Sequence, residues 1–179
     1  LPRCITDIRL PMEDVEEAID DIRPNAGTSE NDIPAVILKQ CKSQLSYPIF
    51  AIWQKSKATG LVPQVLKEQY VAPVFKKGEK TDPANYRPVA LTSHLIKIYE
   101  RIVRKQVVAF LEDNELLSST QHGFRQGRSC LTQLLHHYDN ILRNLCDGAV
   151  SDVLYLDFSK AFDKVDHEIL LRKVWNMGL

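Results

Sequence analysis

The 179-residue chain lacks the features that mark membrane, secreted and repetitive proteins. No apolar run approaches the roughly 20 residues that a membrane helix requires. The first residues, LPRCITDIRL, contain neither an initiator methionine nor the apolar segment of a signal peptide. No internal repeat or low-complexity segment is found. Its apolar and charged fractions, 44% and 26%, are ordinary for a globular protein, so we expect about one domain from a longer chain.

The cysteine pattern argues against the common zinc and disulfide frameworks. Four cysteines are present, and no two of them form a CxxC pair. His136 and His137 lie between Cys130 and Cys146, but this spacing matches no standard zinc site. We therefore expect reduced thiols and an intracellular protein.

The net charge is zero, but the charges are distributed unevenly. Residues 1–40 contain nine acidic and four basic side chains, a net charge of −5. Residues 54–105 contain eleven basic and four acidic side chains, a net charge of +7. A basic middle region is compatible with a polyanionic partner and equally with solvated helix faces, and the charges alone leave both open.

The spacing of apolar residues predicts a mainly helical chain. Helical periodicity covers residues 11–22, 34–45, 48–60, 95–111, 130–145 and 168–178. We expect a kink or break at residues 47–48, because Pro48 lacks the backbone N–H that a helix interior uses. Gly60 should end the helix before it, and Ser129 should cap the helix that follows it.

A β-hairpin is predicted between the helical regions. Residues 69–75 and 86–91 read as two strands, with a basic turn, KKGEK, at residues 76–80. Pro73 indicates an edge strand or a bulge, since proline cannot donate to a sheet ladder.

The segment DVLYLDF at residues 152–158 reads as a buried strand that is apolar on both faces. Asp157 lies inside it, and a buried carboxylate is costly unless it is hydrogen-bonded, paired or bound to metal. Two interpretations follow: a satisfied core aspartate, or a metal-binding carboxylate at the end of a strand. One strand cannot form a sheet, so we expect its neighbouring strands to come from a downstream part of a longer chain or from another molecule.

Several stretches in a fixed order resemble one family. Residues 155–167 (YLDFSKAFDKVDH) look like the first catalytic motif of the reverse transcriptases of non-LTR, LINE-type retrotransposons. Residues 85–93 (NYRPVALTS) and 121–134 (QHGFRQGRSCLTQL) resemble the fingers motifs of that family, and residues 70–78 (YVAPVFKKG) fit the preceding strand. Residues 32–39 (DIPAVILK) resemble its N-terminal segment, although GTSEN replaces the usual Gly-Pro-Asp-Gly before it.

The resemblance implies RNA-directed DNA polymerisation with two divalent ions, Mg²⁺ or Mn²⁺ as a substitute. RNA template, DNA primer and deoxynucleoside triphosphates are the implied partners, with no membrane, and the parent element is expected in nucleus and cytoplasm. Asp157 matches the first metal-binding aspartate of the family, and the backbone carbonyl of Phe158 is the second implied ligand. Asp163 and Asp166 read as helix-entry residues instead.

The same resemblance implies nucleotide contacts. Lys77 and Arg87 match the cations that fold over the β- and γ-phosphates, with Lys76 as the alternative to Lys77. Backbone N–H groups around Lys160 and Ala161 are implied to face the triphosphate.

Three further residues receive implied roles. Phe162 corresponds to the steric gate that excludes a ribose 2′-hydroxyl, or is a packed core phenylalanine. Arg125 and Arg128 are candidate contacts to template or nucleotide, or brace the fingers against the palm.

The expected fold class is α+β: mostly helical fingers with a β-hairpin over residues 1–149, and the start of a polymerase palm over residues 150–179. The second catalytic motif, the rest of the palm and the thumb are missing, so this chain alone is expected to be inactive. Two alternatives stay open: a non-catalytic nucleic-acid-binding remnant, and a helical interaction protein without a ligand.

Overall fold

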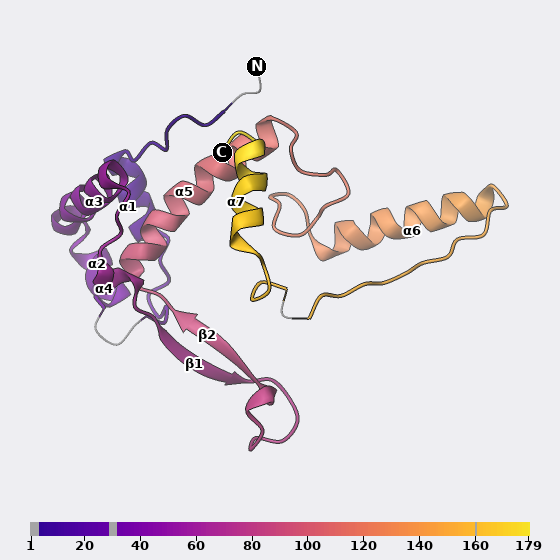
Figure 1. Ribbon diagram of the computed structural model, residues 1–179, viewed down its shortest axis with the longest axis horizontal. Coiled ribbons are helices and arrows are strands. Elements are labelled where there is room, and N and C mark those ends of the chain that lie inside the picture. Colours follow the sequence, from indigo (N-terminus) through magenta and orange to yellow (C-terminus); the bar gives the residue numbers. More distant parts are fainter. Residues whose placement is uncertain (1–3, 29–31, 160) are drawn as a thin grey trace. The chain divides into compact units, whose positions relative to one another are not determined.

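The computed structural model describes residues 4–28, 32–159 and 161–179, which form two compact units. The first unit comprises residues 7–108, and the second comprises the remaining described residues. Helices together with one antiparallel hairpin confirm the expected α+β class (Figure 1). In these residues we find no helix with the length and apolar character of a membrane span.

The hydrophobic core lies in the first unit. Its helices are α1 (Met12–Asp20), α2 (Ala35–Gln40), α3 (Lys42–Thr59), α4 (Gln64–Lys67) and the first part of α5 (His94–Asp113). Buried apolar side chains of α1, α2, α3 and α5 meet around Trp53, which is 1% exposed. The Trp53 ring stacks on Tyr99 of α5, with the ring centroids 4.4 Å apart.

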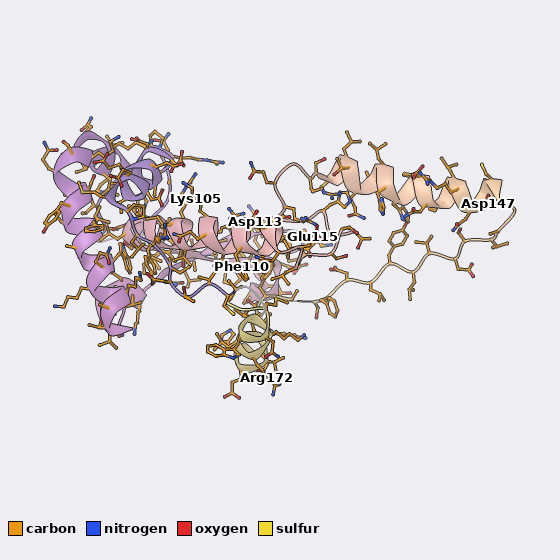
Figure 2. The ribbon with its side chains drawn as sticks, turned by 90° about the horizontal axis from the view of Figure 1, so that it is seen from above. Lys105, Phe110, Asp113, Glu115, Asp147 and Arg172 are labelled. Atoms are coloured by element: carbon orange, nitrogen blue, oxygen red, sulfur yellow. The ribbon has the colours of Figure 1, made fainter. Side chains whose placement is uncertain are left out.

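Opposite charges join α1 to α5 within this unit. The Lys105 ammonium, which is labelled in Figure 2, lies 2.8 Å from Glu17 and 3.2 Å from Asp14. Arg101 pairs with Asp21. The hydrogen bond from Lys105 lowers the pKa of the Glu17 carboxyl. The acidic N-terminal region and part of the basic middle region therefore neutralise each other inside one unit, so these cations do not indicate a polyanionic partner.

The first turn of α5 is held by a carboxylate from 62 residues earlier in the chain. Asp32 accepts hydrogen bonds from the His94 backbone N–H at 2.6 Å, from Ser93 Oγ at 3.0 Å and from the Thr28 hydroxyl. Burial acts to raise the pKa of Asp32, but these hydrogen bonds outweigh it and hold the pKa below its ordinary value. The contacts fix Thr28 and Asp32 against the helix that directly follows the hairpin.

Of the kink or break expected at residues 47–48, the break is not formed. The chain breaks at Cys41 instead, and α3 continues through Pro48 to Thr59. Proline removes one helical hydrogen bond, yet Ile49 and Trp53 follow at helical spacing and are buried in the core. Gly60, in the left-handed conformation at φ 68°, ends the helix as expected.

The hairpin consists of β1 (Tyr70–Phe75) and β2 (Tyr86–Leu91), joined through the 3₁₀ turn η1 (Pro83–Asn85). Pro73 lies directly opposite Pro88. The backbone N–H of Lys76 donates to the carbonyl of Asn85 at 2.8 Å, one step beyond the strand ends. Because hydrogen-bonded and non-hydrogen-bonded pairs alternate along an antiparallel ladder, the two prolines occupy a non-hydrogen-bonded pair. Both prolines therefore lie at sheet edges, as Pro73 indicated.

The second unit contains the end of α5, α6 (Cys130–Cys146) and α7 (His167–Asn176). Ser129 caps α6 as expected, and its side chain forms a reciprocal capping box with Thr132. Asp166 caps α7 by accepting a hydrogen bond from the Ile169 N–H at 3.0 Å, which agrees with a helix-entry role. Among the described residues of this unit no apolar side chain is fully buried.

The buried strand expected at residues 152–158 is not formed. The chain turns after Asp147 and folds back along α6 as an extended segment without a strand partner among the described residues (Figure 2). Asn144 donates to Ser151 at 3.0 Å, and Tyr155 Oη lies 3.0 Å from His137 Nε2. The side chains of the segment are exposed, because strand burial requires neighbouring strands that these residues do not provide.

Candidate functional site

The candidate residues occupy two regions, which belong to different units. The first region is the tip of the hairpin, residues 76–87. The second includes the loop between α5 and α6 and the segment from Asp157 to α7.

The hairpin tip is a closed turn. Gly78 has φ +93°, and a Cβ at this position would lie 2.6 Å from Nδ2 of Asn85. The Asn85 amide donates to the Glu79 carbonyl at 2.9 Å, and the Asp82 side chain accepts from the Ala84 N–H at 2.9 Å. Glycine at residue 78 is therefore required both by backbone conformation and by space.

The hairpin tip presents cations to solvent. Arg87 lies opposite Val74, so it shares a face with Val74 and, by strand alternation, with Lys76. Lys77 follows Lys76 beyond the ladder, and its side chain is exposed. In the described part of the chain no carboxylate pairs with any of these three cations. Lys80 by contrast lies over the Phe75 ring at 5.9 Å, on the opposite face of the strand pair.

Arg125 is held by the protein itself. Its Nε donates to Glu112 Oε1 at 2.9 Å, its Nη2 bonds the second carboxylate oxygen, and its Nη1 donates to the Ser118 carbonyl at 2.8 Å. The bidentate pair lowers the pKa of Glu112 and raises that of Arg125. All three guanidinium nitrogens are engaged, which favours a bracing role, and a template contact by Arg125 stays a prediction.

Arg128, the second arginine of the loop, is exposed and bonded differently. Its Nη1 lies 3.4 Å from Nε2 of His122, and His122 Nδ1 lies 2.8 Å from Thr132 Oγ1. His122 is 6% exposed and its ring centroid is 5.9 Å from that of His136. Burial, then Arg128, His136 and Arg125, lower the pKa of His122.

Two exposed aromatic rings meet in the second unit. Phe124 is 85% exposed and has φ +62°, a left-handed conformation that is strained for a bulky residue. Its ring contacts that of Phe162 edge to face, with centroids 6.5 Å apart. Phe162 is exposed here rather than packed in a core, which is compatible with the steric-gate prediction.

The predicted metal ligands lie on the exposed segment. The Asp157 carboxylate is in solvent, so it carries no cost of burial, contrary to the expectation of a buried strand. Phe158 follows it outside any helix or strand, and Ala161 lies in a turn. Lys160 lies outside the described residues. The described residues contain no cluster of three or more His, Cys, Asp and Glu side chains able to hold a metal.

Comparison with known proteins connects these residues. Residues 75–179 match the family described as reverse transcriptase (RNA-dependent DNA polymerase). The chain belongs to the reverse transcriptase family. The matched range includes the hairpin tip, the α5–α6 loop, Asp157 and Phe162. Family membership confirms the resemblance noted in the sequence, while the roles of the individual residues stay predictions.

The curated relatives of this reverse transcriptase chain come from mobile elements. It is 26% identical over 164 residues to a probable RNA-directed DNA polymerase from transposon BS of Drosophila melanogaster, covering 91% of the chain. It is 30% identical over 113 residues to a probable RNA-directed DNA polymerase from transposon X-element of the same species, and this alignment covers 63% of the chain. An RNA-directed DNA polymerase from mobile element jockey of Drosophila funebris is 24% identical over 90% of the chain. The aligned part is 12–18% of the length of these relatives.

Sequence reasoning missed three contacts of this reverse transcriptase chain: Asp32 with α5, Glu112 with Arg125, and His122 with Arg128. No local sequence signal marks Asp32 or Glu112. The partners of Asp32, Ser93 and His94, lie 61 and 62 residues further along the chain. Arg125, the partner of Glu112, lies 13 residues further along. His122 was visible inside the motif QHGFRQGRS but has no pattern that predicts its burial.

Proposed function

We propose that this chain supplies the fingers and the first palm segment of an RNA-directed DNA polymerase from a non-LTR retrotransposon. Residues 1–149 would form the fingers with an N-terminal extension, and residues 150–179 the first part of the palm. The match of residues 75–179 to the reverse transcriptase family is the observation that carries this proposal. The parent enzyme would work inside the cell, in nucleus and cytoplasm, on an RNA template and a DNA primer.

The hairpin tip would bind the β- and γ-phosphates of the incoming deoxynucleoside triphosphate. Arg87 can donate two parallel hydrogen bonds to phosphate oxygens, and Lys77 supplies a point charge. Their exposure and the lack of a carboxylate partner among the described residues support this role. Lys76 shares the face of Arg87 and is the alternative to Lys77.

Asp157 and the carbonyl of Phe158 would hold a divalent ion. These are hard oxygen donors, the type that Mg²⁺ prefers, so their chemistry fits this metal or Mn²⁺. When bound, such ions lower the pKa of the primer hydroxyl and neutralise the departing pyrophosphate. One carboxylate cannot hold two ions, so further carboxylates must come from other parts of a longer polymerase.

The remaining residues would shape the nucleotide site. Backbone N–H groups at Lys160 and Ala161 would donate to the triphosphate. Phe162, with its ring against Phe124, would block a ribose 2′-hydroxyl and so favour deoxyribonucleotides. Arg128, which is exposed, would contact the template or the nucleotide, while Arg125 would brace the loop against Glu112.

Removing both cations of the hairpin should weaken triphosphate binding. Lys77→Ala combined with Arg87→Ala is expected to lower the affinity for deoxythymidine triphosphate roughly tenfold or more, because two charge-assisted contacts are lost. Titration of the 179-residue chain followed by NMR measures the affinity and reports whether the shifted amides lie in residues 76–87.

A matched variant separates site binding from general charge. Lys55→Ala combined with Lys67→Ala removes the same charge from exposed positions outside the hairpin. This control should keep nearly all of the affinity. Equal losses in both double variants would mean that triphosphate binds the chain only through its overall charge.

The chain alone should not extend a primer. With Asp157 as its one candidate metal carboxylate, it cannot hold the ion pair that nucleotidyl transfer uses. We expect no incorporation on a homopolymer RNA template with Mg²⁺ or Mn²⁺. Incorporation above background that Asp157→Ala abolishes would contradict this expectation.

A further inference from the structure

The loop between α5 and α6 contains one buried histidine whose two ring nitrogens are both engaged. His122 meets Thr132 in the first turn of α6 through Nδ1, and it meets Arg128 through Nε2. The contacts join a buried ring to the exposed arginine that we assign to template or nucleotide.

Hydrogen-bond chemistry fixes the protonation state of this ring. A guanidinium has donors only, so Nε2 of His122 must accept the hydrogen bond from Arg128. The proton therefore resides on Nδ1, which donates to Thr132 Oγ1. The Thr132 hydroxyl can then donate its own proton to the Ser129 carbonyl, 2.9 Å away. Each donor in the network meets an acceptor only when His122 is neutral.

The charges around His122 oppose its protonation. Arg128 and Arg125 of the loop and His136 of α6 all face it, and with burial they lower its pKa. Glu112 of α5, whose pKa Arg125 and Arg128 both lower, is already paired with Arg125. Proton uptake on Nε2 would also turn the acceptor into a donor directed at another donor, which breaks the contact with Arg128.

We propose that His122 is a positioning residue: its neutral ring fixes the guanidinium of Arg128 so that the remaining N–H groups face a nucleic-acid phosphate. Acidification then releases Arg128 from this position. The inference rests on the proposed function, because it requires that Arg128 contacts a polyanion. Among the described residues, Arg128 forms no ion pair, and Glu112, whose pKa its charge helps to lower, is held by Arg125. The side-chain donors of Arg128 other than Nη1 can therefore meet a ligand.

The test compares the effect of Arg128→Ala at two pH values. Binding of a short single-stranded RNA is measured by fluorescence anisotropy with the whole 179-residue chain. At about pH 8 we expect Arg128→Ala to weaken binding roughly tenfold, the loss of one charge-assisted contact. At a second pH, below the lowered pKa of His122 that ¹⁵N NMR of the ring locates, the same substitution should change the affinity little. The ratio of the variant affinity to the unsubstituted affinity at each pH cancels the general gain in affinity for RNA that any protein shows as acid makes it more positive.

Variants of His122 separate positioning from a structural role. Glutamine at this position cannot be protonated, but its amide oxygen can still accept a hydrogen bond from Arg128. His122→Gln should therefore keep the affinity at the higher pH and lose the pH dependence. His122→Phe fills the space without an acceptor, so Arg128→Ala should add little to it at either pH.

Two outcomes would overturn the inference and differ in what else they overturn. If Arg128→Ala weakens binding equally at both pH values, or His122→Gln retains the pH dependence, the positioning role is wrong while the phosphate contact stands. If Arg128→Ala has no effect at any pH, the proposed contact of Arg128 fails as well. An independent readout needs no RNA: ¹⁵N NMR should show the proton of His122 on Nδ1, and a proton on Nε2 contradicts the proposal.

Discussion

Trp53→Ala is expected to lower the free energy of unfolding of the first unit by about 3–5 kcal/mol. The ring is 1% exposed at the centre of the core, and it stacks on Tyr99 of α5. Alanine removes the buried indole ring and leaves a cavity between α3 and α5 that the close-packed neighbouring side chains fill only partly. Urea unfolding followed by circular dichroism measures the change.

Trp53→Phe is the matched control. The indole Nε1 is buried and has no hydrogen-bond partner among the described residues, so phenylalanine loses no polar contact. It keeps an aromatic ring against Tyr99, and we expect a cost of about 1–2 kcal/mol. Equal effects of Phe and Ala would show that the stacked ring is not the source of the stability.

Asp32→Ala should destabilise the first unit by about 2–4 kcal/mol, the second largest effect that we expect. Alanine leaves the Ser93 hydroxyl and the His94 N–H without their acceptor at the start of α5. Trp53 fluorescence in a Trp175→Phe background reports on this unit alone, since the second tryptophan, Trp175, lies exposed in α7.

Asp32→Asn keeps one acceptor oxygen in nearly the same shape, so its cost should be about half that of alanine. A loss of stability in Asp32→Ala that is no larger than a typical surface substitution, within about 0.5 kcal/mol, would mean that the carboxylate does not anchor α5.

Acid should destabilise the same unit through two groups. The pKa of Asp32 is lowered in the fold, and burial, despite the nearby Asp32, lowers the pKa of His94, whose side chain is 0% exposed. For each group the unfolded state binds protons more strongly, so stability is present at neutral pH and is lost as pH falls. The His94 contribution should decline below about pH 6.5, and that of Asp32 below about pH 4. Unfolding curves that do not weaken between about pH 7 and pH 4 would contradict this.

Local sequence signals predicted most of the elements. The apolar spacing located α1, α5, α6 and α7, Gly60 and Ser129 marked helix ends, and alternation located the hairpin. Each of these signals acts between residues close together in the chain, which is why sequence alone suffices. Pro48 shows the limit of such rules, because burial of Ile49 and Trp53 in the core outweighs the hydrogen bond that proline removes.

The candidate residues could be named from the sequence, but their contacts could not, and their roles stay predictions. The motifs placed Arg87, Asp157 and Phe162, and the family match covers all three. The predicted burial of Asp157 was wrong, since a strand becomes buried only through partners far away in sequence. For the same reason the pairs Glu112–Arg125 and His122–Arg128 could not be predicted, because they depend on how the loop folds back.

The facing prolines of the hairpin have a consequence for self-association. In a non-hydrogen-bonded pair, the backbone nitrogens of Pro73 and Pro88 point outward, to the two open margins of the ribbon. Neither nitrogen carries a hydrogen, so an approaching β-strand meets a gap in the donor row midway along either margin. The two-stranded hairpin therefore resists pairing edge to edge with copies of itself, which leaves its basic tip accessible to small anionic molecules.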